Sequence, residues 1–345
     1  MSEINREEHM NAVTNTESAA LAVIEPGHDR SKYLGGSDIA AVMGLSPWQT
    51  PVELWMEKTG RTPREIPDAA RQRMFDRGHK LEPFIRDMVI AKLQDMGCTV
   101  EVIAINQRYA DAEHPFLACE IDFELRLTGT VEIGGNEYEF DGEEINADAK
   151  SVSGFARKKW GMDSNEDVPI EYAAQFMHGL GIRNRRVCLV AALRSFDDVD
   201  IYWTVRDDET IAAMRDKAAL FWNQCVLADT APDPLTFDDI KLLFPSDNGE
   251  SAEATPEIAQ KISDLRRIKA AIKDLEEQET LLTFDIGQFI SPNSSLKRDG
   301  VELCTWKAQA TTRLDQKKLK EDLPDVHNKY CKTTTTRVLR LKKGT

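Results

Sequence analysis

Asp148-Ala149-Lys150, preceded twenty-six positions earlier by Asp122, is the stretch that decides how this chain of 345 residues is interpreted. If residues 144–152 form a strand, Asp148 and Lys150 point to the same face, because side chains alternate along a strand. Two carboxylates and an ammonium group on consecutive strands suit Mg²⁺-dependent hydrolysis of a phosphodiester, which needs a hard cation and charge stabilisation. The pattern is short, and a surface strand with alternating polar residues would also produce it.

The chemistry of that reaction assigns a role to each position of the pattern. Asp122 and Asp148 are candidate ligands of the cation, and the carbonyl of Ala149 is placed to add a third oxygen. Lys150 could orient or deprotonate the attacking water and offset charge at phosphorus. Glu120 shares the strand face of Asp122 at i, i+2, so either acid could be the first ligand.

The composition predicts a globular chain without a membrane span. Hydrophobic residues make up 41% of the chain and charged residues 30%. Apolar runs such as Val187–Leu193 are too short to cross a bilayer, and the first residues lack the features of a secretory signal. Six scattered cysteines without a C-x-x-C pair favour reduced thiols. We therefore expect a cytoplasmic protein.

The net charge of −15, from 44 basic and 59 acidic residues, argues against indiscriminate binding of nucleic acid. It leaves room for a local groove that grips DNA with the help of metal ions. Basic clusters that could contact DNA, or form solvated faces, are Arg157-Lys158-Lys159, Arg183 with Arg185-Arg186, and residues 337–343.

Helix signals dominate the chain up to residue 96, after a polar flexible arm at 1–29. Thr50-Pro51 is a typical helix start, and glycine at 44 and 60 is typical of helix ends. The expected helices are 37–44 with Ser37 as N-cap, 50–60, and 69–96, in which Pro83 marks a kink or a new start.

Strand-like periodicity follows, and Gly134-Gly135-Asn136 is a hairpin-turn signal. Helices and strands then alternate up to residue 228. This order predicts an α/β core with a mixed central β-sheet flanked by helices. The expected strands are 99–105, 116–127, 130–140, 144–152, 186–193 and 199–206, and the expected helices are 169–182 and 208–228.

The C-terminal part has a different character. Residues 231–256 are expected to be a linker, and 257–345 a helical, coiled-coil-like extension with short strands at 301–308 and 334–341. We expect its heptad-like apolar stripe, interrupted by Glu279, to mediate contacts within or between subunits. The stripe consists of Ile258, Leu265, Ile268, Ile272, Leu275, Leu282, Ile286 and Phe289.

Further polar residues fit the same chemistry. Glu82 lies on a helix before the sheet, and Gln175 on the helix after the Lys150 strand. Arg30 and Ser37 flank Gly35-Gly36 at a helix start, an arrangement that suits a phosphate. Taken singly, each also reads as an ordinary surface or capping residue. His178 is interpreted as packed or as a DNA contact. The tryptophans expected in the core are Trp48, Trp55, Trp160 and Trp222.

In this order the motifs resemble the YqaJ-type viral recombinases, phage and prophage exonucleases similar to bacteriophage lambda exonuclease, in the PD-(D/E)xK superfamily. The resemblance begins with Leu34-Gly-Gly-Ser-Asp-Ile-Ala-Ala-Val-Met-Gly-Leu-Ser-Pro-Trp48 and continues through Gly78-His-Lys-Leu-Glu82. It covers roughly residues 30–230. It implies a restriction-endonuclease-like core in that region, with the helical C-terminal extension beyond it.

The resemblance also implies roles for the central motif. Asp122 and Asp148, with the Ala149 carbonyl, would bind Mg²⁺, for which Mn²⁺ could substitute, and Lys150 would activate the attacking water. Two features depart from the family pattern. Asp148 stands where the family most often has Glu, and Asp122 follows Glu120-Ile121 in place of the common Pro-Asp-Gly turn.

For the remaining positions, the resemblance implies that Glu82 acts through a water on the cation or at a second cation. Gln175 would position water and phosphate, and Arg30 and Ser37 would bind the 5′-terminal phosphate of DNA.

The activity implied is 5′→3′ degradation of one strand of double-stranded DNA, in a bacterial host and of phage or prophage origin. The 3′ overhang would pass to a separately encoded single-strand annealing protein, and a ring-shaped homotrimer would enclose the DNA. Two alternatives remain open from the sequence. One is a structure-specific DNA endonuclease of the same fold, and the other a non-catalytic DNA-binding or assembly protein.

Overall fold

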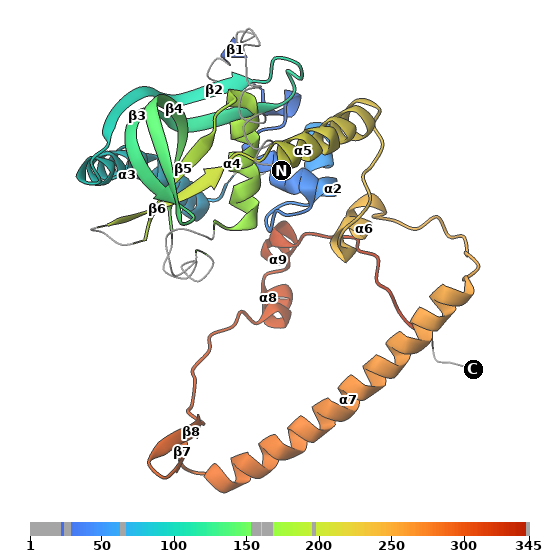
Figure 1. The fold of residues 1–345 in the computed structure, drawn as a ribbon. Coiled ribbons are helices and arrows are strands. Elements are labelled where there is room, and N and C mark those ends of the chain that lie inside the picture. Colours follow the sequence, from blue (N-terminus) through green and yellow to red (C-terminus); the bar gives the residue numbers. More distant parts are fainter. Residues whose placement is uncertain are drawn as a thin grey trace, which may run out of the picture. The chain divides into compact units, whose positions relative to one another are not determined.

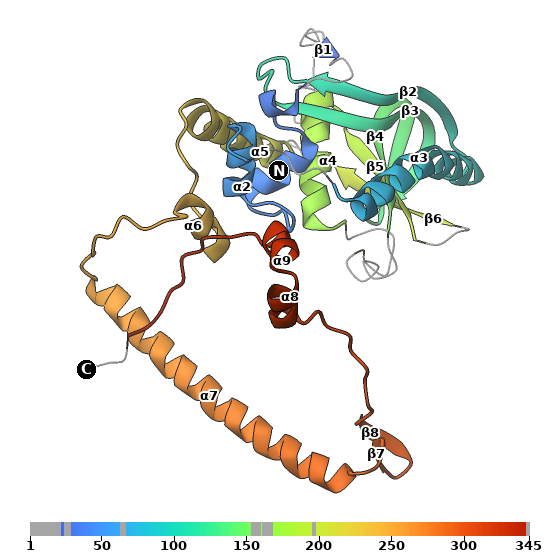
Figure 2. The same ribbon diagram turned by 180° about the vertical axis from the view of Figure 1, so that it is seen from behind.

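A computed structural model of the chain describes residues 22–23, 29–62, 67–152, 160, 168–194 and 198–342. The chain divides into two compact units, Met1–Leu243 and Phe244–Thr345, and each is described by itself (Figures 1 and 2). Most of the predicted N-terminal arm and the basic cluster Arg157-Lys158-Lys159 lie outside the described residues.

The first unit is built on one sheet whose strands follow the order β1-β2-β3-β4-β5-β6. In its described strands, β4 and β5 run parallel, and every other neighbouring pair is antiparallel. The predicted mixed sheet flanked by helices is therefore confirmed. The strands are β1 (Ala22–Val23), β2 (Thr99–Ala110), β3 (Ala118–Ile133), β4 (Asn136–Ser151), β5 (Val187–Leu193) and β6 (Val199–Val205).

Helices cover both faces of this sheet (Figures 1 and 2). Helix α3 packs Ile85, Val89 and Leu93 against one face. On the other face, α4 crosses between the parallel strands, and α1, α2 and α5 pack beside it. The helices are α1 (Gly36–Met43), α2 (Pro51–Lys58), α3 (Ala69–Asp95), α4 (Ile170–Arg183), α5 (Asp208–Leu220), a π-helical continuation (Phe221–Leu227) and α6 (Phe237–Leu243).

Several boundaries in the first unit differ from the sequence prediction, and β2 continues to Ala110 where the strand was expected to end at 105. Helix α3 runs through Pro83 without a new start. The strand expected at 116–127 continues to Ile133 as β3, because the polar run at 128–130 forms a bulge between Leu127 and Gly129. The strand expected at 130–140 is divided by the hairpin turn between β3 and β4, and β4 also includes most of the strand expected at 144–152. Gly129 has φ 137°, and a Cβ there would lie 2.9 Å from Sγ of Cys98. Helix α6 falls inside the segment expected to be a linker.

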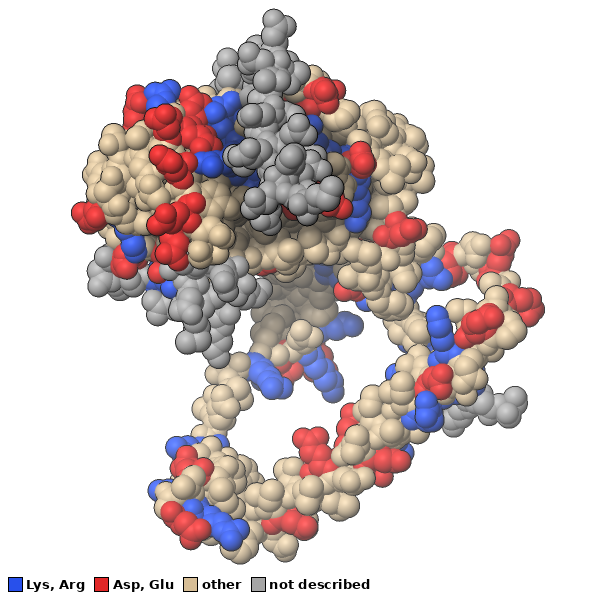
Figure 3. Space-filling view, viewed as in Figure 1, with Lys and Arg blue, Asp and Glu red and all other residues tan. Residues whose placement is uncertain are grey.

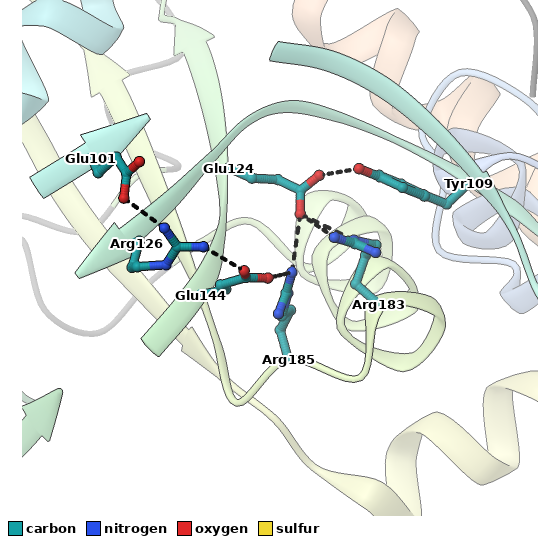
Figure 4. A network of polar contacts seen from close by, with 7 residues as sticks. All are labelled: Glu101, Tyr109, Glu124, Arg126, Glu144, Arg183 and Arg185. Atoms are coloured by element: carbon teal, nitrogen blue, oxygen red, sulfur yellow. Dashed lines mark hydrogen bonds and ion pairs between the residues drawn. The ribbon is translucent and has the colours of Figure 1, made fainter. Parts of the chain in front are cut away.

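A buried acid anchors the end of α4 to the sheet (Figure 4). Glu124 on β3 accepts hydrogen bonds from the Tyr109 hydroxyl over 2.5 Å and from Arg183 Nε over 3.1 Å. Arg185 contacts both Glu124 and Glu144. Burial opposes the charged form of Glu144, but its arginine partners outweigh burial and lower its pKa. These arginines of the predicted basic cluster are therefore neutralised inside the protein.

A second buried ion pair fixes the segment that leads into α1. Nζ of Lys58, on α2, lies 2.8 Å from Oδ2 of Asp38 and donates to the carbonyls of Arg30 and Tyr33 over 2.7 Å each. The same Asp38 oxygen accepts the N–H of Gly35 over 2.9 Å. The Lys58 ammonium group thus holds the 3₁₀ turn Arg30–Lys32 next to the start of α1.

The second unit contains one long helix and small elements. Where a strand was expected at 334–341, the structure has no regular element. Among the described residues, none of the helices combines the length and the apolar character needed to span a bilayer. The elements are α7 (Pro256–Ile290), a hairpin of β7 (Ser295–Arg298) and β8 (Val301–Thr305), α8 (Gln316–Asp322) and α9 (Pro324–Tyr330).

Candidate functional site

The candidate site lies where β3 and β4 separate. Their ladder ends at the pair Phe123 and Ala147. Continued in register it would pair Asp122 with Asp148 and then Ile121 with Ala149, but β3 there pairs with β2 alone. The N–H of Ala149 instead donates to Oδ2 of Asp122 over 2.8 Å. A carboxylate thus replaces a backbone carbonyl at the end of the ladder, which brings Asp122 against the Asp148-Ala149-Lys150 motif.

Asp148 and Lys150 lie together on the face that α4 covers. Nζ of Lys150 lies 2.5 Å from Oδ1 of Asp148 and over the rings of Tyr172 and Phe176, at 5.4 and 5.5 Å from their centres. Nε2 of Gln175 donates to the other Asp148 oxygen over a long 3.4 Å. The strand alternation expected from the sequence therefore matches the structure at these two residues.

Asp122 and Asp148 lie close together in a site that is largely shielded from solvent, and Lys150 only partly offsets the repulsion between their charges. Burial, and then the charge of Asp148, raise the pKa of Asp122 to about 7, while Lys150 acts in the opposite direction. Burial also raises the pKa of Asp148 against the opposing effect of Lys150. For Lys150, burial disfavours the ammonium form, but the attraction of Asp148 and Asp122 outweighs it and raises the pKa. Two acids that repel each other in low dielectric are suited to a cation.

The donor set fits a Mg²⁺-type ion that keeps several waters. The described residues contain no group of three or more His, Cys, Asp or Glu side chains arranged to hold a metal. Mg²⁺ is typically held by one or two carboxylates, with waters and substrate phosphates completing its shell. The N–H and C=O of one strand residue point to the same side, so the Ala149 carbonyl is directed toward the side of Asp122.

The predicted phosphate-binding residues come from a segment beside the start of β3. Leu34 pairs with Leu117, and its N–H donates to the Phe116 carbonyl over 2.7 Å. Nη2 of Arg30 donates to Oγ of Ser37 over 3.3 Å. Ser37 lies in the first turn of α1, and the N-cap is Gly35, which corrects the predicted capping role. The hydroxyl of Ser37 is thus placed next to a guanidinium at a helix N-terminus.

Helix α1 and helix α4 approach closely at this point. A Cβ on Gly36 would lie 2.8 Å from Cγ of Gln175, so the contact requires glycine at position 36. This packing places the first turn of α1 next to the residue that contacts Asp148.

One cavity of about 330 Å³ joins the two groups of residues. Ala149 and Lys150 are not among the described residues that line it, and Lys150 reaches the site through its contact with Asp148. Glu120 also lines the cavity but is paired with Arg108 over 2.9 Å, while Asp122 contacts the motif. The predicted site residues in the lining are Arg30, Ser37, Glu82, Asp122, Asp148 and Gln175.

Asn146 is a site residue that sequence reasoning missed. Its side chain lines the cavity, is 1% exposed, and has no hydrogen-bond partner for either amide atom among the described residues. Its signal was available, because Asn146 precedes Asp148 by two positions and so shares its strand face. A buried amide without partners next to a carboxylate pair is unusual and suggests an external ligand.

The burial of His178 agrees with the sequence interpretation, whereas that of Trp48 does not. His178 is buried, and its Nε2 contacts the Ala118 carbonyl at 3.0 Å. Burial lowers its pKa to about 4, so it is a packed neutral histidine. Trp48 was expected in the core, but it is 61% exposed, with its ring 5.7 Å from that of Tyr172.

A mixed sheet with two carboxylates near the carboxyl end of a parallel strand defines an α/β domain with an acidic site. Residues 27–186 match the family model of the YqaJ-like viral recombinase domain, which confirms the resemblance seen in the sequence motifs. Over 321 residues, 91% of this chain and 92% of the relative, the sequence is 27% identical to the protein YqaJ of Bacillus subtilis (strain 168). That alignment extends into the second unit.

Solved structures show likeness at low identity. LHK-Exo in complex with dAMP is 20% identical, with a TM-score of 0.40 over 58% of this chain and 90% of that chain. A structure of an alkaline exonuclease (LHK-Exo) from Laribacter hongkongensis has 18% identity with the same TM-score and coverage. The structure of SSO0001 is 12% identical, with a TM-score of 0.31 over 67% of this chain and 93% of that chain.

Proposed function

We propose that the first unit is a Mg²⁺-dependent DNA exonuclease of phage-type recombination. It degrades one strand of duplex DNA from a 5′ end and leaves a 3′ overhang for a separate annealing protein. The proposal is supported by the match of residues 27–186 to the YqaJ-like viral recombinase domain.

The observation that carries the proposal is the shared cavity. A carboxylate pair alone would serve an endonuclease or an exonuclease. Here the same cavity is lined by Arg30 and Ser37 at the N-terminus of α1 and by Asp122 and Asp148. Helix N-termini and guanidinium groups bind phosphate. A terminal phosphate bound by Arg30 and Ser37 would occupy the same cavity as the carboxylates. Cleavage would then take place close to the end of the strand, which favours an exonuclease.

The side chains divide the work as follows. Asp122, Asp148 and the Ala149 carbonyl would hold the cation, and Glu82 would contact it through a water. When bound, the cation would polarise the scissile phosphate and favour ionisation of an attacking water. Gln175 holds Asp148 in place and can also donate to a phosphate oxygen.

Lys150 acts as a permanent positive charge in this proposal. Its raised pKa keeps it an ammonium, and its contact with Asp148 fixes the orientation of that carboxylate. An ammonium near phosphorus stabilises the charge that develops during hydrolysis. Orientation of the attacking water and stabilisation of charge at phosphorus are the roles proposed for this residue.

The proposal is tested by digestion of matched linear duplexes that carry either a 5′-phosphate or a 5′-hydroxyl, with Mg²⁺ or with EDTA. We expect cutting in Mg²⁺ alone, faster from the 5′-phosphate, and no cutting of a covalently closed circle. Replacement of Arg30 by Gln should remove the preference for 5′-phosphate. Cutting of the closed circle would support the endonuclease alternative, and loss of cutting with all substrates would support a binding protein.

A further inference from the structure

The apolar stripe of α7 is a surface without a partner in the described part of the chain. Helix α7 runs without a break from Pro256 to Ile290 (Figure 1). Leu275 is 62% exposed and Phe289 is 75% exposed, and the other stripe residues are exposed or, at Leu265, half-buried. Trp306, directly after β8, packs near Gly287 of α7, which is not a stripe position. An apolar stripe of this length requires a helical partner in water.

The stripe keeps strict 3–4 heptad spacing from Ile258 to Phe289 if its two charged positions are counted. These positions are Lys261 and Glu279. They have opposite charge and lie at equal distances, nine residues, on either side of residue 270. Every other position of the stripe is apolar.

Because of this symmetry, the stripe of one α7 helix can pair with the stripe of a second, antiparallel α7 helix. In an antiparallel pair of α7 helices centred on residue 270, Lys261 of one copy lies opposite Glu279 of the other, twice by the two-fold axis. The apolar positions then face apolar positions throughout the overlap of residues 256–284. These facing pairs are Ile258 with Leu282, Leu265 with Leu275, and Ile268 with Ile272.

Competing alignments lack this match. A parallel pair in register would place Lys261 against Lys261 and Glu279 against Glu279, which repel. An antiparallel pair shifted by one heptad would bury Lys261 against Ile286, and Glu279 would face Ile268. Burying an unpaired charge is costly, and a polar residue at a core position fixes register for this reason.

The remaining charges of α7 favour the same orientation. Residues 256–269 carry four basic and two acidic side chains, and residues 271–284 carry one basic and four acidic ones. On the face seen in Figure 3, acidic side chains are prominent along the half of α7 nearer the hairpin. An antiparallel pair lays each basic half along an acidic half, whereas a parallel pair juxtaposes like charges.

We propose that α7 is an antiparallel coiled-coil interface that joins two copies of this chain. The other helices of the second unit, α8 and α9, have seven residues each and are too short to cover the stripe. The proposal is independent of the exonuclease activity, because none of the cavity residues belongs to α7.

The test uses the full chain and measures its mass by sedimentation and light scattering across a concentration series. We expect an assembly with an even number of chains. Lys261→Glu or Glu279→Lys should each raise the dissociation constant about tenfold or more, since each creates two like-charge contacts. The double variant should restore assembly, and Lys317→Glu on α8 serves as the matched control. Circular dichroism should show unchanged helix content in all variants.

Orientation is tested by placing a photo-crosslinking benzoylphenylalanine at position 258. The expected product joins position 258 to the peptide that contains Leu282. Those positions lie roughly 36 Å apart within one helix, so the product must come from two chains. A wild-type monomer or trimer, a crosslink from position 258 to position 258, or single variants that assemble as well as wild type would each overturn the proposal.

Discussion

Oδ2 of Asp122 on β3 accepts a hydrogen bond from the backbone N–H of Ala149 on β4, over 2.8 Å. Because the strands separate at this point, the carboxylate is held by the sheet backbone itself and does not depend on a neighbouring side chain for its orientation. Glu120, two residues earlier on the same face, is instead held by Arg108. Asp122 and Glu120 were the two alternatives for the first cation ligand, and of the two only Asp122 contacts the Asp148-Ala149-Lys150 motif.

Replacement of Asp122 by Asn should therefore lower Mg²⁺-dependent cutting of linear duplex DNA by a factor of at least about 100, the scale expected when a group that stabilises transition-state charge is lost. Glu120→Gln is the matched control and should retain activity within a few-fold. Initial rates over a Mg²⁺ titration provide the measurement. A reversed result, with Glu120→Gln inactive, would move the ligand two residues along β3.

Removal of the buried ammonium of Lys58 should destabilise the first unit. Lys58→Met leaves the Asp38 carboxylate buried without its partner, and such a broken pair typically costs about 3–5 kcal/mol. The exposed pair Lys241 and Asp238 is the control, and Lys241→Met should cost less than about 1 kcal/mol. Urea unfolding followed by tryptophan fluorescence measures both. Equal losses for the two variants would contradict the role given to Lys58.

Asn146→Leu should increase stability while lowering cutting. The amide is buried and finds no hydrogen-bond partner in the described part of the chain, so an apolar side chain of similar size removes an unsatisfied group whose cost is about 1–3 kcal/mol. If Asn146 contacts DNA in the cavity, the same change raises the KM or lowers kcat. The exposed Asn223→Leu is the control for both readouts. An unchanged rate would limit Asn146 to a structural role.

His178 should make the first unit sensitive to acid. Its folded pKa, about 4, lies below the ordinary value of 6.5 because burial disfavours the charged ring. Its contribution to stability is complete above pH 6.5 and is lost as the pH falls toward 4, because the unfolded chain binds the proton first. The loss approaches about 3 kcal/mol.

The measurement is the melting temperature between pH 7 and pH 4 for wild type and His178→Gln. Gln can keep a donor toward the Ala118 carbonyl but does not titrate. The wild-type curve should fall more steeply with acid than the variant curve. Parallel curves would show that another group controls the acid transition.

The sequence predicted the site where local periodicity determines geometry. Asp148 and Lys150 share a face because strands alternate, and Thr50-Pro51 begins a helix because its backbone groups are capped locally. Asp38 and Lys58 could not be paired in advance, since their contact depends on how two helices pack. The same reason applies to the burial of Asn146.

The misplaced elements have physical causes of the same kind. The Thr-rich run at 334–341 has strand propensity, but the described residues offer it no neighbouring strand to supply hydrogen bonds. Gly129 was interpreted as a break between two strands, because glycine is common both in turns that end strands and in bulges within them.

The bulge at Gly129 has a practical consequence for engineering. It separates the distal part of the β3–β4 hairpin, which ends in the turn Gly134-Gly135, from the stretch that carries the acids. Apart from the immediate chain neighbours, the described residues place no atom within 4 Å of a Cβ built on either turn glycine, so the tip has free space on the described side. A fluorescent or affinity module inserted between Gly134 and Gly135 would have room to fold there, giving a reporter fusion far from both termini in sequence.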